Sequence, residues 1–84
     1  MPKHSDPFVP FLGREMCARR ESKGLSQSRL AKMSGVTPVT VSRIESGQRG
    51  SLRTLRELCE VMDVRFSDVI ASAEDEFYRS RQAP

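Results

Sequence analysis

Basic side chains are the residues of this sequence whose type and distribution point most directly to chemistry. Residues 14–56 hold ten Lys or Arg against three acids, whereas residues 57–76 hold seven acids against Arg65 alone. Charge separated by sign along so short a chain gives the folded protein a positive face, which attracts a polyanion and steers its approach. The alternative is an ordinary solvated helix surface, and the charge pattern alone favours neither interpretation.

Residues with catalytic or metal-binding chemistry are few and widely spaced. His4 is the only histidine, and no group of carboxylates or cysteines has ligand or catalytic spacing. Cys17 and Cys59 each fall on an apolar stripe of a predicted helix, so we expect both to be reduced core residues. We therefore expect no enzyme activity, no metal and no cofactor, and the length leaves no room for a domain that binds a small-molecule ligand.

The size and composition of the chain predict one small domain. Its 84 residues are 37% hydrophobic and include four Phe and one Tyr, and domains of this size have thin cores and are often oligomeric. No apolar run approaches the roughly 20 residues that cross a bilayer. The opening residues, MPKHSDPFVPF, are too short and too broken by proline for a signal peptide. We expect a cytoplasmic homodimer with no membrane partner.

Capping residues and apolar periodicity predict five helices, and therefore an all-α fold. The first helix begins at Pro10 or Phe11 and continues to about Lys23. Later helices are expected at 27–34, from Pro38 until Gly47, after the N-cap Ser51 and after the N-cap Ser67, with a frayed end in YRSRQAP. The domain organisation is an N-terminal arm at 1–10, a helical domain at 11–73, and a C-terminal extension at 74–84 that can continue the last helix. Phe8, Val9 and Phe11, around the end of the arm, are able to fold back onto the domain.

Residues 26–47 are predicted to form a helix, a tight turn and another helix. Gly35 ends the first of these, Val36 places an apolar side chain in the turn, and Thr37 with Pro38 begins the second. Its helical period places Val41, Ile44 and Glu45 on one side. The opposite side carries Val39, Ser42, Arg43 and Ser46, and it has no core partner.

Arg20 stands out in the first helix because it continues the otherwise apolar stripe of Leu12 and Met16. A charged group at such a position needs a partner if it is partly buried.

The run from Gln27 to Gly47, QSRLAKMSGVTPVTVSRIESG, resembles the helix-turn-helix of the Cro/C1 family of bacterial and phage regulators, also called the XRE family. The resemblance continues over roughly Leu12 to Ile70, and the matching residues of the run are Gln27, Leu30, Ala31, Gly35, Val36, Val41, Ser42, Ile44 and Glu45. It implies a five-helix lambda-repressor-like DNA-binding domain. It also implies that Arg20 pairs with Glu45 and that double-stranded DNA is the partner.

In this family the second helix of the motif lies in the DNA major groove, while the preceding helix abuts the backbone. The resemblance therefore implies base contacts from Arg43, Val39, Pro38 and Ser42. A guanidinium matches guanine O6 and N7 with two hydrogen bonds, whereas Val39 could only contact a thymine methyl. Phosphate contacts are implied for Gln27, Thr37, Gln48, Arg49, Ser51 and Arg53. Many members carry glutamine where this chain has Pro38 and Val39.

The resemblance predicts a sequence-specific transcriptional regulator, and by default a repressor that binds an inverted repeat as a homodimer in the bacterial or phage nucleoid. A dimer interface on the last helix would use Val69, Ile70, Ala73 and Phe77, although some of these residues can belong to the monomer core. Two alternatives stay open: an antitoxin-like protein that grips a partner protein and regulates its own operon, and a restriction-modification controller. RNA binding is a remote alternative, because basic and aromatic residues do not interleave.

Overall fold

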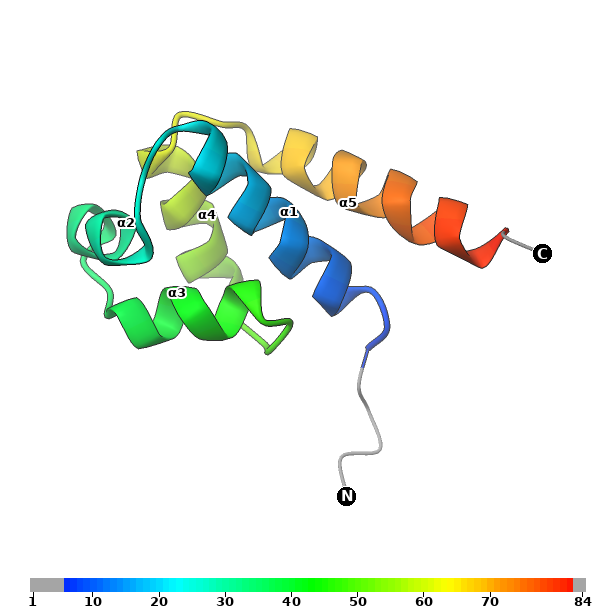
Figure 1. The fold of residues 1–84 in the computed structure, drawn as a ribbon, viewed down its shortest axis with the longest axis horizontal. Coiled ribbons are helices and arrows are strands. Elements are labelled where there is room, and N and C mark those ends of the chain that lie inside the picture. Colours follow the sequence, from blue (N-terminus) through cyan, green and yellow to red (C-terminus); the bar gives the residue numbers. More distant parts are fainter. Residues whose placement is uncertain (1–5, 83–84) are drawn as a thin grey trace, which may run out of the picture.

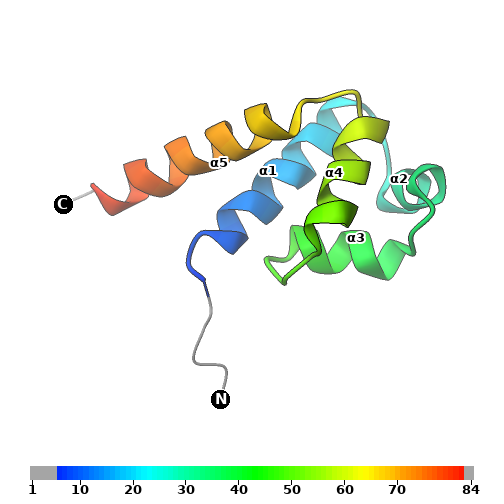
Figure 2. The same cartoon turned by 180° about the vertical axis from the view of Figure 1, so that it is seen from behind.

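Five α-helices make up the fold in a computed structural model that describes residues 6–82. They are α1 (Val9–Ser22), α2 (Gln27–Ser34), α3 (Pro38–Glu45), α4 (Leu52–Val61) and α5 (Phe66–Arg81). Figures 1 and 2 show α2 and α3 together at one end, and α5 running beside α1 toward the opposite end. Residues 6–82 contain no strand, and the predicted all-α class is confirmed.

α2, α3 and α4, the three short helices in the middle of the sequence, each begin at a side-chain cap. The hydroxyls of Ser26, Thr37 and Ser51 accept a hydrogen bond from the backbone N–H three residues ahead, at 3.0, 3.2 and 3.0 Å respectively. Such a cap satisfies one of the backbone donors that a helix start leaves free and contributes about 1 kcal/mol. These local signals fix where α2, α3 and α4 begin.

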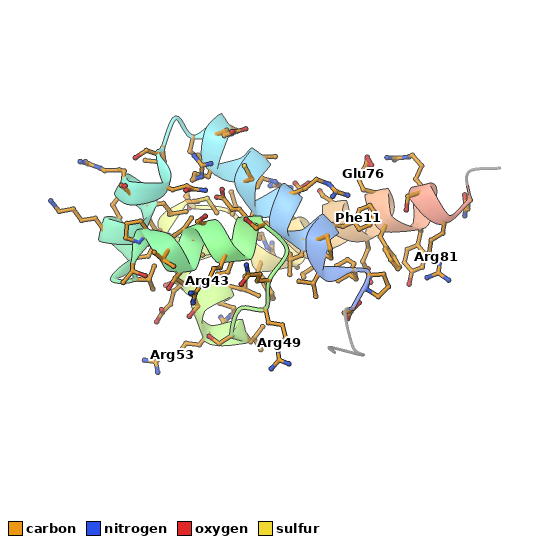
Figure 3. The ribbon with its side chains drawn as sticks, turned by 60° about the horizontal axis from the view of Figure 1, so that its bottom comes forward. Phe11, Arg43, Arg49, Arg53, Glu76 and Arg81 are labelled. Atoms are coloured by element: carbon orange, nitrogen blue, oxygen red, sulfur yellow. The ribbon has the colours of Figure 1, made fainter. Side chains whose placement is uncertain are left out.

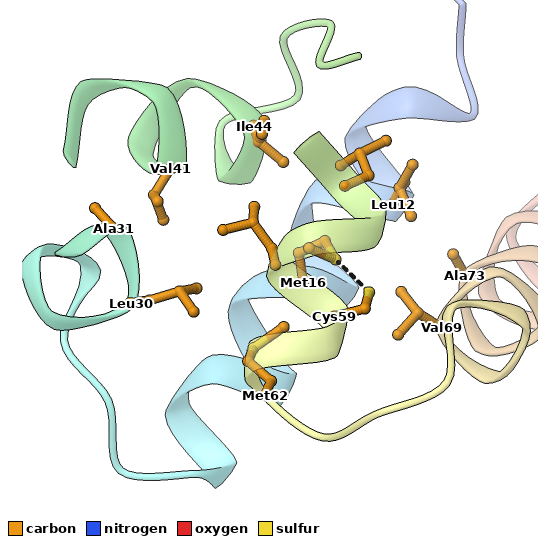
Figure 4. Close-up of a cluster of buried hydrophobic side chains, with 12 residues drawn as sticks. Leu12, Met16, Leu30, Ala31, Val41, Ile44, Cys59, Met62, Val69 and Ala73 are labelled. Atoms are coloured by element: carbon orange, nitrogen blue, oxygen red, sulfur yellow. Dashed lines mark hydrogen bonds between the residues drawn. The ribbon is translucent and has the colours of Figure 1, made fainter. Parts of the chain in front are cut away.

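The core lies where α1, α4 and α5 meet the inner sides of α2 and α3 (Figure 4). At its centre the Cys59 thiol donates to the Met16 sulfur across 3.8 Å, and burial raises the pKa of the Cys59 thiol. The buried apolar side chains are Leu12, Met16, Leu30, Ala31, Val41, Ile44, Leu55, Leu58, Cys59, Met62, Val69 and Ala73. One continuous core therefore supports all five helices.

The start of α1 takes in part of the segment predicted to be an arm. The helix begins at Val9, one residue before the predicted start, and the Asp6 carboxylate accepts a hydrogen bond from the Phe8 backbone N–H at 2.8 Å. Residues 1–5 lie outside the described part of the chain.

The two ends of α5 differ from the sequence prediction. The helix begins at Phe66 with Arg65 at the N-cap position, so Ser67 is inside the helix and is not its cap. At the other end, α5 continues to Arg81, so the C-terminal extension continues the last helix as the sequence allowed, whereas the frayed end expected in YRSRQAP is helical as far as Arg81.

The continuation of α5 has a physical cause in its aromatic contacts. The ring of Phe77 packs edge-on against Phe8 and Phe11 of the α1 start, with ring centroids 5.7 and 5.5 Å apart. Such pairs contribute about 0.5 to 1.5 kcal/mol beyond the area they bury. Because the partners are far away in the sequence, no local signal in α5 identifies them.

Within the described residues, no helix is long and apolar enough to cross a membrane.

Candidate DNA-binding interface

The α2–α3 turn holds the two helices of the motif at a fixed angle. Gly35 adopts the left-handed conformation (φ 73°) that only glycine reaches without strain, and so ends α2. The Val36 backbone N–H then donates to the Ala31 carbonyl oxygen at 3.0 Å, and the Val36 side chain packs on the core. The geometry is a helix, a tight turn and a second helix.

The face of α3 that points away from the core carries the residues for which base contacts are predicted. Val41 and Ile44 are buried on the inner side, whereas Arg43 is exposed and Val39 keeps 54% of its surface accessible. Pro38 is exposed in the first turn, and Ser42 is half-buried. Within residues 6–82, Arg43 forms no ion pair, so its guanidinium is free to bind a ligand.

A buried ion pair anchors α3 to α1. Arg20 donates from Nε to Glu45 Oε2 at 2.7 Å and from Nη2 to Oε1 at 3.0 Å, while its Nη1 donates to the Leu25 carbonyl oxygen at 2.7 Å. The Arg20 and Glu45 side chains are only 11% and 6% exposed. The two parallel bonds form the bidentate arrangement that gives an arginine–carboxylate pair its geometric specificity.

Gln27 also binds the Glu45 carboxylate, a contact that the sequence did not predict. Its Nε2 donates to Glu45 Oε1 at 2.9 Å, so α1, α2 and α3 all meet at one carboxylate. Burial alone would raise the pKa of Glu45, but the hydrogen bonds from Arg20 and Gln27 and the charge of Arg20 outweigh it and hold the pKa below its ordinary value. This bond uses one N–H of the Gln27 amide, and the other N–H has no hydrogen-bond partner among the described residues.

Cys17 lies at the edge of the Arg20–Glu45 pair, with its sulfur 3.5 Å from Arg20 Nη2. Burial and the Glu45 carboxylate raise the pKa of the Cys17 thiol, so it remains protonated beside the ion pair. The sequence predicted that Cys17 is a core residue, but it is only half-buried and lies outside the core, because this side of α1 faces the Arg20–Glu45 pair.

The residues for which phosphate contacts are predicted fall into two groups. The Thr37 and Ser51 hydroxyls accept the capping bonds of α3 and α4. The Ser51 hydroxyl also donates to Thr54 Oγ1 at 2.9 Å, and the Thr37 hydroxyl is hydrogen-bonded to the Thr40 hydroxyl at 3.1 Å, so a phosphate would compete with these local bonds. Gln48 and Arg49 are exposed in the loop of residues 46–51, which we name the α3–α4 loop. In the first turn of α4, Arg53 Nε lies 3.5 Å from Glu57 Oε2, and the Arg53 side chain is 86% exposed.

Figure 3 shows Arg43, Arg49 and Arg53 extending from α3, the α3–α4 loop and α4 toward the same side of the molecule. The only acid between Leu25 and Leu52 is Glu45, and its charge is already compensated inside the fold by Arg20. The exposed surface of this segment is therefore basic and carries no opposing negative side chain.

The four residues named for a dimer interface separate into two kinds. Val69 and Ala73 are 0% and 1% exposed within the single chain, so both are core residues and cannot contact a second subunit. Ile70 and Phe77 are half-buried and stay available at their outer edges. Val69 and Ala73 are buried because the side of α5 that carries them packs on α1.

The described residues hold no group of three or more His, Cys, Asp or Glu side chains that could bind a metal. His4 lies outside them.

Comparisons with known proteins agree with this geometry. The helix-turn-helix family model matches residues 18–69. The chain is 33% identical over 66 residues to the uncharacterized HTH-type transcriptional regulator RghRB of Bacillus subtilis, covering 76% of this chain and 47% of that protein. The HTH-type transcriptional repressor RghR of the same organism is 33% identical over 63 residues, covering 73% of this chain and 47% of RghR. The chain thus spans about half the length of these relatives.

Two solved structures have the same arrangement of helices. The clp gene regulator ClgR from Corynebacterium glutamicum superposes with a TM-score of 0.77 at 28% identity, covering 81% of this chain and 88% of that chain. The restriction-modification controller protein C.AhdI from Aeromonas hydrophila gives 0.69 at 32% identity, covering 73% and 94%. The family match takes in the end of α1, α2, α3, α4 and the start of α5, and the chain belongs to the Cro/C1-type (XRE) helix-turn-helix family.

Proposed function

We propose that this chain binds double-stranded DNA in a sequence-specific way and regulates transcription. The observation that carries the proposal is the outward face of α3, where Arg43 is exposed and unpaired among the described residues, on a helix fixed from behind by the Arg20–Glu45 pair. A reading helix has to be both free on one side and rigid on the other, because base contacts require side chains held in register with the groove.

In the proposed complex, α3 enters the major groove and Arg43 donates two hydrogen bonds to a guanine. Val39 contacts a thymine methyl, and Pro38 and Ser42 border the same bases. Gln27, at the first turn of α2, would bind a phosphate through its free N–H, helped by the helix dipole.

On the other flank of α3, Thr37, Gln48, Arg49, Ser51 and Arg53 would contact the backbone. These contacts would set the register of α3 on the duplex without reading sequence. The chemistry is binding alone, so the proposal includes no catalytic step.

The proposed active form is a homodimer on an inverted repeat, since two copies of α3 must reach half-sites about 34 Å apart on one side of the duplex. Repression by blocking access to a promoter is the expected mode for such a protein, and its expected location is the bacterial cytoplasm, on the nucleoid. The name of the relative RghR, a repressor, supports this direction.

Selection of bound duplexes from a random library is the experiment that tests the function. We expect the selected sequences to converge on a palindrome with half-sites one helical turn apart and a guanine in each half. Arg65→Ala, which changes an exposed arginine outside the proposed interface, should select the same sequence. A library that stays random after repeated rounds would contradict the proposal.

A narrower candidate within the same class is a restriction-modification controller. It is favoured by the likeness to C.AhdI, 94% of whose chain is covered. In that case the selected palindrome should occur upstream of a linked restriction or methyltransferase gene. An antitoxin-like role would instead require a partner protein that co-purifies with the chain and releases it from its site.

A further inference from the structure

The start of α1 lies unusually close to the end of α3 and to the α3–α4 loop. A Cβ atom placed on Gly13 would come well under 3.0 Å from the carbonyl oxygen of Ile44. It would also lie 3.0 Å from the carbonyl oxygen of Glu45 and 3.1 Å from the backbone nitrogen of Gly47. All three neighbours are backbone atoms, which cannot rotate away as a side chain can. Gly13 is therefore the residue that permits α1 to touch the last turn of α3.

The α3–α4 loop makes a second close contact with α1, one turn earlier. Gly47 has a φ of 91°, a conformation open to glycine, and a Cβ there would meet the Cα and ring atoms of Pro10 at 3.1 to 3.3 Å. The loop is also tied to α3, because the Gln48 backbone N–H donates to the Arg43 carbonyl oxygen at 2.9 Å. Pro10 and Gly13 on one side and Gly47 on the other form a contact that we name the α1–loop seam.

The far end of the α3–α4 loop rests on α3, because a Cβ on Gly50 would come 2.8 Å from Ile44 Cγ1. Between the loop and the start of α1 lies a cavity of about 80 Å³, whose lining includes Gly13, Gln48, Arg49 and Gly50. Arg49 itself is exposed. Because this space separates the middle of the loop from α1, the position of Gln48 and Arg49 is set by the seam at Gly47 on one side and by the contact of Gly50 with Ile44 on the other.

We propose that Gly13 and Gly47 are positioning residues that aim Arg49 at a DNA phosphate. The inference rests on the proposed function, and it assigns the phosphate contact of the loop to the packing of α1. A Cβ on Gly13 would force α1 and the end of α3 apart by roughly 1 Å before ordinary van der Waals separation is restored. A charge-assisted hydrogen bond from arginine to phosphate has a length of about 2.7 to 2.9 Å, and a displacement of that size breaks it.

The test is the salt dependence of DNA binding in a two-by-two set of variants: wild type, Gly13→Ala, Arg49→Ala and the double variant. Each phosphate contact adds about one unit to the slope of log affinity against log salt. We expect Arg49→Ala to lower the slope by about one unit in the wild-type background. Gly13→Ala should lower it by a similar amount, and adding Arg49→Ala to Gly13→Ala should lower it no further.

Two comparisons separate positioning from loss of stability. Val69→Ala removes buried side-chain atoms at α5, away from the seam, and it should reduce stability while leaving the full Arg49 effect on the slope. Arg43→Ala, combined with Gly13→Ala, should reduce preference for the selected site as it does in the wild type. All slopes are measured at a temperature where circular dichroism shows each variant fully folded.

If Gly13→Ala does not fold, Gly47→Ala approaches the seam from the loop and takes its place in the same cycle. The proposal would be overturned if Arg49→Ala lowered the salt-dependence slope as much in the folded Gly13→Ala or Gly47→Ala background as in the wild type. It would also be overturned if Arg49→Ala alone left the wild-type slope unchanged. The first result would leave the proposed function intact, and the second would remove only the Arg49 phosphate contact from it. Sequence-specific binding by the wild-type chain is tested separately, by the selection from a random library.

Discussion

At the scale of single residues, the carboxylate of Glu45 holds the motif together. It accepts hydrogen bonds from Arg20 of α1 and from Gln27 of α2 while it belongs to α3. The sequence made Arg20 conspicuous as a charge on an apolar stripe, and the family resemblance supplied its partner. The part played by Gln27 could not be predicted in the same way, because a glutamine at a helix start is ordinary and its amide can turn toward solvent or inward.

Glu45→Gln should lower the free energy of unfolding by about 3 to 5 kcal/mol, because it leaves the Arg20 guanidinium buried without its counter-charge. Chemical denaturation of the wild type and the variant measures this difference. Glu57→Gln is the matched control: it breaks the exposed pair with Arg53 and should cost no more than about 1 kcal/mol. Equal, small losses for the two variants would show that the Arg20–Glu45 pair adds nothing to stability.

The depressed pKa of Glu45 also predicts how stability depends on pH. A carboxyl whose folded pKa lies below its unfolded value of about 4.3 binds its proton less readily in the native state. Its contribution is therefore complete above pH 4.3 and is lost as the pH falls through the folded value. Thermal unfolding between pH 7 and pH 3 should show a steeper acid loss for wild type than for Glu45→Gln. Parallel curves for the two proteins would contradict this.

At the scale of elements, the local signals of the sequence predicted the inner helices better than the outer ones. Ser26, Thr37 and Ser51 act as caps in the structure, at the positions where a small hydroxyl side chain precedes an apolar pattern. The end of α5 was predicted to fray. It is stabilised by a tertiary contact between Phe77 and the start of α1, which the local sequence does not reveal. Apolar periodicity places Phe77 on one side of α5, but it does not say which distant residues pack against it.

Phe77→Ala should loosen the last turns of α5 and lower the unfolding free energy by about 2 kcal/mol, since it removes the edge-to-face contacts with Phe8 and Phe11 of the α1 start as well as the one with Tyr78. Hydrogen exchange of backbone amides in residues 77–81 should accelerate more than exchange in α4. Arg79→Ala is the comparison, because it removes only an exposed i, i+3 pair with Glu76 on the same helix. If Arg79→Ala released these amides as much as Phe77→Ala, the rings would not be what holds the helix.

At the scale of the whole molecule, the separation of charge along the chain becomes a separation of surfaces. The seven acids between residues 57 and 76 are all exposed, and they lie on α4, the α4–α5 turn and α5. Between α2 and the start of α4, by contrast, the one acid is turned inward and paired. The composition predicted a positive face, but only the fold shows that Arg43, Arg49 and Arg53 extend from three different segments to one side (Figure 3).

In the proposed complex α3 reads the bases, while the α3–α4 loop beside it contacts the DNA backbone. The most direct test of this arrangement is the affinity of wild type, Arg43→Ala and Arg49→Ala for the selected site and for a random duplex of equal length, at one salt concentration. Arg43→Ala should lose about 1 to 3 kcal/mol on the selected site and much less on the random duplex. Arg49→Ala should weaken binding to the selected site and to the random duplex equally. Equal losses by Arg43→Ala on the two duplexes would contradict base reading by α3.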